Sequence, residues 1–309
     1  MSGSAASVAR VTATRPAADI ARPAPVSSGA LLAVVITVFA WASAFVAIRA
    51  VGAHYDPGPL ALGRLVVGTL ALGVSVLVGR RWVAPNRTEW TLIAVAGVAW
   101  FGAYNIALNA AEQRVDAGTT AMLVNVGPIL IALFAGLLLG EGFPRWLVIG
   151  ALVAFSGAVL VGAATAQGTS DVWGAVLCLV AAVTYAIGVL AQKPAVRRLP
   201  PLQVTFLSCA IGAVVCLPFT PGLVREVAAA PVSATGWLVY LGVVPTALAF
   251  STWAYALARM DAGRLGVSTY AVPPITIALG AGLLGEVPPP LAVVGGVICL
   301  VGVGLSRRR

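Results

Sequence analysis

Long runs of apolar residues recur along almost the whole chain and limit its possible folds more than any other feature. A helix needs about 20 mainly apolar residues to cross a hydrocarbon core about 30 Å thick. Helices satisfy their backbone hydrogen bonds inside lipid, whereas isolated strands do not. We therefore predict an all-α polytopic membrane protein with ten transmembrane helices, at about residues 30–51, 58–79, 90–111, 117–140, 145–164, 172–192, 201–219, 235–257, 262–285 and 289–306.

The composition also indicates a protein that faces lipid rather than water. Of the 309 residues, 60% are hydrophobic and 9% are charged, whereas soluble domains carry about 25% charged residues. The formal net charge is +9, but the basic residues form short clusters between apolar runs, so we expect no nucleic-acid partner. The four cysteines lie inside apolar runs, so we expect neither disulfides nor a metal site, and we predict no cofactor.

The distribution of basic residues predicts the orientation in the membrane. With the N-terminus inside, 15 of the 19 Lys and Arg residues fall on the cytoplasmic side. The other four are Arg49, Arg64, Arg114 and Arg225. Cytoplasmic loops carry such an excess of positive charge, so we predict that both termini are cytoplasmic in a multi-pass plasma-membrane or inner-membrane protein. Residues 1–29, rich in Ala, Pro, Ser and Arg, are predicted to form a disordered cytoplasmic tail.

Two parts of the chain repeat each other at a spacing of 145 residues. The segment "RVDAG" at 114–118 corresponds to "RMDAG" at 259–263, and "GPILIALFAGLLLGE" at 127–141 corresponds to "VPPITIALGAGLLGE" at 272–286. Residues 30–164 and 172–306 then form two five-helix repeats. Five is odd, so the second repeat enters the membrane from the opposite face, as in many secondary transporters. A shift of one residue would pair Pro128 with Pro274 instead of Pro273, and the sequence leaves both pairings open.

These features resemble the drug/metabolite transporter superfamily, and in particular its ten-helix EamA-type exporters. The resemblance rests on "FAWASAFVAIR" in the first helix, "GRLVVGTLAL" in the second and the P…LGE phrase that ends the fourth and ninth helices. It implies export of small metabolites, often amino acids or toxic compounds, through a central cavity lined mainly by helices 1, 3, 4, 6, 8 and 9. Pro245 departs from the family pattern, because small residues are more usual there.

Polar and aromatic side chains at membrane depth are the candidate substrate-binding residues, since such groups usually face a cavity or a partner helix. Asn105 and Asn109 share a helix face, and interhelical amide bonds are the alternative role. Pro128 and Pro273 are predicted to bend helices beside the cavity, and Glu141 and Glu286 to cap helices. The candidates for substrate binding are Trp41, Ser43, Asn105, Asn109, Asn125, Tyr185, Trp253 and Tyr270.

Arg64 lies about two turns into the second helix, and we predict that it reaches the lipid headgroups. The alternative is that it attracts an anionic group at the outer vestibule. The middle of the predicted spans carries no acidic residue, so the sequence gives no support for proton antiport through a buried carboxylate.

The sequence favours a secondary transporter that exports small metabolites by alternating access. An intramembrane enzyme would need a Ser/His dyad, paired Asp or a His-rich cluster, and the chain has one His, in a loop, so we predict no enzymatic activity. A metabolite-uptake permease and a non-transporting scaffold or sensor are the alternatives. The expected partners are a small-molecule substrate and the bilayer, with the chain as a monomer or homodimer.

Overall fold

The computed structural model describes residues 27–139, 145–165, 169–260, 265–266 and 268–305. These residues form helices joined by short connections, with no strand among them, which confirms the all-α prediction. Most of the predicted tail, Glu141 and Asp261 lie outside the described residues. The first helix begins at Ser28, where the side chain of Ser27 accepts a hydrogen bond from the backbone N–H of Ala30, so the predicted boundary at residue 30 was late.

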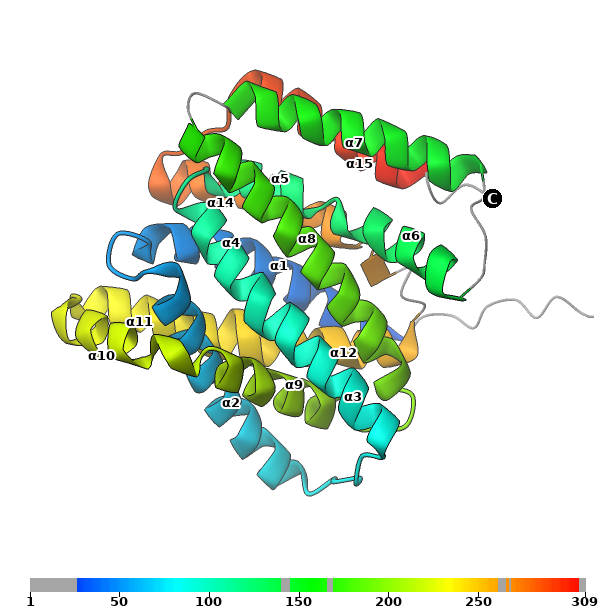
Figure 1. Ribbon diagram of the computed structural model, residues 1–309, viewed down its shortest axis with the longest axis vertical. Helices are drawn as coiled ribbons and strands as arrows, with labels where there is room; N and C mark the ends of the chain where they lie inside the picture. Colours follow the sequence, from blue (N-terminus) through cyan, green and yellow to red (C-terminus); the bar gives the residue numbers. More distant parts are fainter. Residues whose placement is uncertain (1–26, 140–144, 166–168, 261–264, 267, 306–309) are drawn as a thin grey trace, which may run out of the picture.

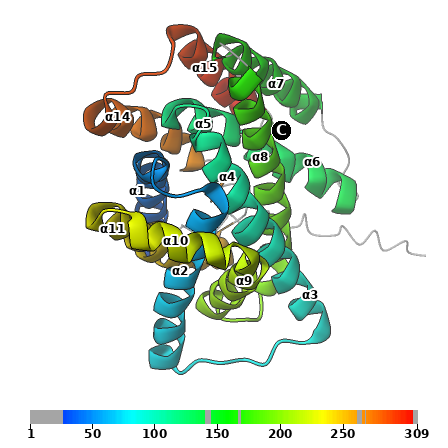
Figure 2. The ribbon, with the colours of Figure 1, turned by 60° about the vertical axis from the view of Figure 1, so that its left-hand side comes forward.

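The helices follow one another through short connections (Figures 1 and 2). In chain order they are α1 Ser28–Val51, α2 Pro57–Gly79, α3 Arg87–Ala96, the π-helical η1 Gly97–Ala103, α4 Tyr104–Glu112, α5 Ala117–Val124, α6 Gly127–Leu139, α7 Arg145–Thr165, α8 Thr169–Ala195, α9 Pro201–Val215, the 3₁₀ turn η2 Leu217–Phe219, α10 Thr220–Ala229, α11 Val232–Leu241, the π-helical η3 Gly242–Leu248, α12 Ala249–Arg259, the 3₁₀ turn η4 Thr269–Ala271, α14 Val272–Leu284 and α15 Pro290–Leu305.

Several of these helices are long and apolar enough to cross a membrane. In the described part of the chain, five helices meet this test, and a sixth span results if α9 is joined to the bent η2–α10 segment. Four shorter apolar helices accompany them. Large apolar side chains such as Leu70, Leu77 and Leu152 are exposed on the outer surface. Lipid rather than water suits such a surface, so the chain is a multi-pass membrane protein.

Helix α10 and the bend before it were not predicted. The predicted seventh span, 201–219, ends its α-helix at Val215, and the chain turns by 53° into η2 and α10. The phrase "CLPFTPG" explains the turn, because Pro218 and Pro221 lack the N–H groups that would continue α9. Gly58 of α2 lies directly against the ring of Phe219, where a Cβ would meet ring atoms at 2.3 Å. This segment therefore covers the first turns of α2.

Pro128 and Pro273 begin helices instead of bending continuous ones. The predicted 117–140 helix is interrupted at Asn125 and Val126, and Pro128 is the second residue of α6. Pro273 is likewise the second residue of α14, after the 3₁₀ turn η4. Proline suits the first helical turn because its missing N–H would have no intrahelical partner there. Because Pro128 and Pro273 are each the second residue of their helix, Pro273 rather than Pro274 is favoured as the counterpart of Pro128.

Two π-helical segments interrupt the third and eighth predicted spans. Gly97 begins η1 and Gly242 begins η3, 145 residues apart, and each segment has seven residues. Pro245 lies within η3, where the wider turn accommodates a residue without an N–H. A Cβ on Gly97 would lie 2.8 Å from Ile211 of α9, and one on Gly242 would lie 2.5 Å from Val67 of α2. Glycine is therefore required at both crossings.

Several contacts between helices have a counterpart between the helices at equivalent positions of the two predicted repeats. The α9–η1 contact corresponds to α2–η3, α4–α8 to α1–α12, and α6–α8 to α1–α14. Helices α7 and α15 lie side by side at one edge of the molecule (Figures 1 and 2). The inner faces of α1, α2, α4, α5, α8 and α12 meet around the centre, where the candidate site lies.

Candidate functional site

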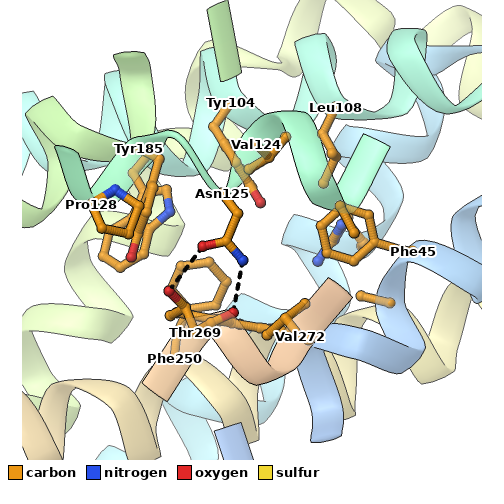
Figure 3. A pocket seen from close by; sticks show the side chains of 15 residues that line it. Phe45, Tyr104, Leu108, Val124, Asn125, Pro128, Tyr185, Phe250, Thr269 and Val272 are labelled. Carbon is orange, nitrogen blue, oxygen red and sulfur yellow. Dashed lines mark hydrogen bonds between the residues drawn. The ribbon is translucent and has the colours of Figure 1, made fainter. Parts of the chain in front are cut away.

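A cavity of about 50 Å³ lies where helices from distant parts of the chain meet. Its walls combine aromatic rings, small apolar residues, an amide and a guanidinium (Figure 3). The lining residues are Trp41, Ala44, Phe45, Arg64, Trp100, Tyr104, Leu108, Ala121, Val124, Asn125, Pro128, Tyr185, Phe250, Thr269 and Val272. Trp41, Asn125, Tyr185 and Pro128 were predicted from the sequence to lie at such a site.

Aromatic rings from α1, η1, α8 and α12 form one wall. The ring centroid of Trp41 lies 5.4 Å from that of Phe250, which in turn lies 4.9 Å from Trp100. Trp100 also lies 5.2 Å from Tyr185. These separations and tilted geometries are favourable for aromatic pairs. The wall depends on Gly188, because a Cβ there would lie 2.3 Å from the Cβ of Trp100.

Asn125 connects the interruption between α5 and α6 to the start of the α14 segment. Its Nδ2 donates to the carbonyl oxygen of Thr269 at 2.8 Å, and its Oδ1 lies 3.5 Å from the Thr269 hydroxyl (Figure 3). That hydroxyl also donates to the carbonyl of Gly266 at 2.8 Å. Since residues 125 and 269 are 144 positions apart, this contact joins the two halves of the chain beside the cavity.

Arg64 lies in the cavity wall, so the prediction that it reaches the headgroups was wrong. The residue is 2% exposed, because η3 and the α10–α11 segments cover the first turns of α2. Its Nε donates to the hydroxyl of Thr246 at 3.2 Å. Within the described residues, its Nη1 has no hydrogen-bond partner, and no carboxylate lies within 4.0 Å of the guanidinium.

Asn105 and Asn109 are buried but do not line the cavity. The Nδ2 of Asn105 donates to the carbonyl of Phe101 at 2.7 Å, inside the π-helical turn where the backbone spacing is irregular. The Nδ2 of Asn109 donates to the carbonyl of Pro57 at 3.0 Å, at the start of α2. Asn109 therefore makes an interhelical bond, the alternative role stated above, whereas Asn105 bonds to the backbone of its own span. Their part in substrate binding stays a prediction.

Ser43, Trp253 and Tyr270 also lie outside the lining. The hydroxyl of Ser43 is 2.7 Å from that of Tyr240, and Trp253 lies behind Trp41 at a centroid distance of 4.9 Å. Tyr270 packs against the small cluster that contains Ile129. Trp253 thus supports a lining residue, whereas Ser43 and Tyr270 face other contacts.

Glu286 does not cap a helix as predicted, because it forms an ion pair. Its Oε1 accepts from the Nε of Arg49 at 2.8 Å, linking the end of α1 to the connection after α14. The glycine before it, Gly285, ends α14 with φ at 68°, a left-handed conformation that a residue without a Cβ adopts readily. The second "LGE" phrase, residues 284–286, therefore encodes a helix end followed by an ion pair.

Glu112 is a fully buried carboxylate at the end of α4. It is 0% exposed, and neither carboxylate oxygen has a hydrogen-bond partner in the described part of the chain. Its backbone carbonyl accepts from Nη1 of Arg49 at 2.7 Å. The sequence placed this residue one turn beyond Asn109 near a span end, and it gave no sign of complete burial.

The cavity is too small to hold a metabolite in this conformation. Ligand pockets usually measure about 300–1,000 Å³, whereas one water needs about 10–15 Å³ of such space. At about 50 Å³ the cavity has room for a few waters, and the surrounding helices must separate before a larger molecule can enter. A buried, partly polar cavity at the centre of a membrane-spanning helical bundle is a typical feature of membrane transporters.

Comparison with known proteins identifies the family. The model of the EamA-like transporter family matches residues 28–163 and 172–308, so the chain belongs to this family. Its relatives indicate transporters rather than enzymes. A solved crystal structure with 21% sequence identity matches with a TM-score of 0.64 and covers 91% of this chain and 98% of its own, which shows the same fold.

Three relatives that are similar over most of their length are named as transporters or exporters. A probable terminal-alkyne amino-acid exporter from Streptantibioticus cattleyicolor is 39% identical over 91% of this chain and 94% of its own. An uncharacterised transporter from Bacillus subtilis is 32% identical over 85% of this chain and 86% of its own. The pseudopaline exporter of Pseudomonas aeruginosa is 27% identical over 91% of this chain and 97% of its own.

Proposed function

We propose that this protein is a secondary transporter that exports amino acids or related small metabolites by alternating access through the central cavity. The observation that carries the proposal is the central cavity, which lies where residues from both halves of the chain meet. Its lining includes Asn125 and Pro128 from the first half and Thr269 and Val272 from the second.

An inverted repeat of two five-helix units is part of this proposal. The two π-helical segments start 145 residues apart, and Pro128 and Pro273 share that spacing and the same position in their helices. The corresponding helix contacts support a pseudo-two-fold relation between residues 30–164 and 172–306. Ten spans with both termini in the cytoplasm follow from such a repeat together with the distribution of basic residues.

Alternating access needs a contact that can hold the cavity shut and then release. The hydrogen bond from Asn125 to the Thr269 carbonyl joins helices of the two proposed repeats directly at the cavity. Interhelical hydrogen bonds within membranes are worth about 0.6 kcal/mol on average and at most about 1.7 kcal/mol. A contact of this strength can break at a useful rate, which suits a gate better than a permanent link.

The relatives and the walls of the cavity support this substrate class. Two of the relatives are named as exporters, one as a probable terminal-alkyne amino-acid exporter and the other as a pseudopaline exporter. The aromatic wall formed by Trp41, Trp100, Tyr185 and Phe250 suits an apolar side chain or an ammonium group.

A counterflow screen in proteoliposomes tests the proposal. Purified protein is reconstituted with unlabelled amino acid inside, and uptake of the same labelled amino acid is measured against empty liposomes. Accumulation of chemically unchanged label is expected for at least one amino acid. If no amino acid moves while cationic dyes do, the substrate class is wrong, and if nothing moves, a scaffold or sensor role replaces transport. Efflux from loaded cells with and without the protein then separates export from uptake.

A further inference from the structure

The charge of Arg64 is the least compensated feature of the cavity. A guanidinium remains protonated in proteins, so burial does not neutralise it. Arg64 is the single charged residue among those that line the cavity, and its one described side-chain partner is the hydroxyl of Thr246. A buried charge without a counter-charge costs several kcal/mol. Stability alone therefore does not explain an arginine at this position.

Among the described residues, no acidic side chain lies within 4.0 Å of the Arg64 guanidinium, and Glu112 of α4, which packs against α2, is not paired with it. The two ion pairs in the described part of the chain, Arg49–Glu286 and Arg198–Glu89, involve other arginines. Thr246 of η3 accepts the hydrogen bond of Arg64, and the polar groups close to Arg64 on the other packed elements are Tyr104 of α4 and Cys209 of α9. Nη1 is buried without a hydrogen-bond partner among the described residues, and Arg64 is one of the residues that line the cavity.

We infer that Arg64 binds the carboxylate of the transported substrate and so restricts transport to carboxylate-bearing metabolites. This inference rests on the proposed function and adds a chemical class and a binding residue to it. Guanidinium–carboxylate contacts are strong because they are charge-assisted and can be bidentate. With the carboxylate at Arg64, the aromatic rings of Trp41, Trp100 and Tyr185 are left to contact the remainder of the molecule.

The inference makes a prediction about the unmodified protein. For each amino acid moved in the counterflow screen, its primary amide and its decarboxylated amine are added as unlabelled competitors. These analogues keep the side chain and the nitrogen but lack the carboxylate. The amino acid is expected to compete at least 10-fold better than either analogue, because a site with a buried polar group discriminates strongly against ligands that leave it unpaired. Equal competition by the amide would overturn the inference and leave the transporter proposal intact.

Substitution of Arg64 provides the second arm of the test. In R64Q, transport of the amino acid is expected to fall about 10- to 100-fold, the range for one lost hydrogen-bonded charge, and discrimination against the amide is expected to disappear. R64K keeps the charge and is expected to restore part of the discrimination. R114Q is the matched control, because Arg114 is exposed and its Nη1 donates to the carbonyl of Ala110 in the preceding helix α4.

The outcomes separate the inference from the function. Size-exclusion profiles and thermal unfolding in detergent show whether each variant folds. If R64Q folds and transports amino acid and amide as the unmodified protein does, Arg64 does not bind the carboxylate. If R64Q does not fold, the competition experiment with the unmodified protein still decides the question. If the unmodified protein moves no compound at all, the proposed function fails and the inference fails with it.

Discussion

The bond between Asn125 and the Thr269 carbonyl gives a sharp prediction, because its acceptor belongs to the main chain. The substitution N125L removes the amide and keeps a similar volume. The Thr269 carbonyl also accepts from the backbone N–H of Val272, so it keeps a partner after the substitution. The full penalty for an orphaned carbonyl therefore does not apply, and the expected loss of unfolding free energy is about 1 kcal/mol.

The hydroxyl of Thr269 contributes little to the same contact. It lies 3.5 Å from Oδ1 of Asn125, at the limit of hydrogen bonding, and its shorter bond goes to Gly266. In T269V the hydroxyl is lost but the main-chain acceptor remains. The coupling energy between N125L and T269V in a double-mutant cycle is therefore expected to stay below about 0.5 kcal/mol.

Unfolding titrations with SDS in mixed micelles measure these free energies for the unmodified protein, both single variants and the double variant. A coupling energy as large as the whole N125L effect would show that the Thr269 side chain, not its carbonyl, makes the contact. No loss of stability in N125L would show that the bond is absent from the stable state. The first result would refute the assignment of the bond to the main-chain carbonyl, and the second would refute the proposed role of Asn125 in holding the cavity shut.

Three further predictions concern helix ends and buried charge. G285A is expected to lower the free energy of unfolding by about 1–2 kcal/mol, because φ is 68° at Gly285. G282A is the control, since Gly282 lies in the same helix with open space around it, and it is expected to be neutral or stabilising. Thermal unfolding measures both. E112Q is expected to preserve or raise stability at pH 7, since it removes an unpaired buried carboxylate, and a clear loss in the SDS titration would contradict this. In a double-mutant cycle, R49Q and E286Q are expected to show a coupling free energy of about 0.2–1 kcal/mol, because both side chains are roughly a third exposed. High salt is expected to lower this coupling free energy.

The helices were predictable from sequence because lipid demands a length of apolar chain that is visible without any tertiary information. The interruptions within them were less visible. The turn at Asn125 is marked in the sequence only at its end, by Gly127 and Pro128, and the π-helical segment at Gly97 contains no proline. Helix α10 is only ten residues long and moderately polar, so it fell below the length that marks a span.

The candidate site was predictable in part, and the errors have a common cause. Trp41, Asn125 and Tyr185 were identified because polar or aromatic side chains deep in a helix need a special environment. Arg64 was placed at the headgroups because its distance along α2 allows this, and only the packing of η3 and the α10 segment prevents it. Glu286 was assigned to a helix cap because its partner Arg49 lies 237 residues away in the sequence. Contacts between distant segments decided both cases.

The π-helical segments determine which side chains the following helices turn toward the cavity. An α-helix advances about 100° per residue, so one residue more or less in the segment rotates everything beyond it by that angle. Tyr104 and Leu108 follow η1, and Phe250 follows η3, and all three line the cavity. A deletion of one residue within 97–103 that restored regular α-helix would turn Tyr104 and Leu108 toward the neighbouring helices. Each wide turn thus sets the phase of half a helix, and the composition of the cavity wall depends on that phase.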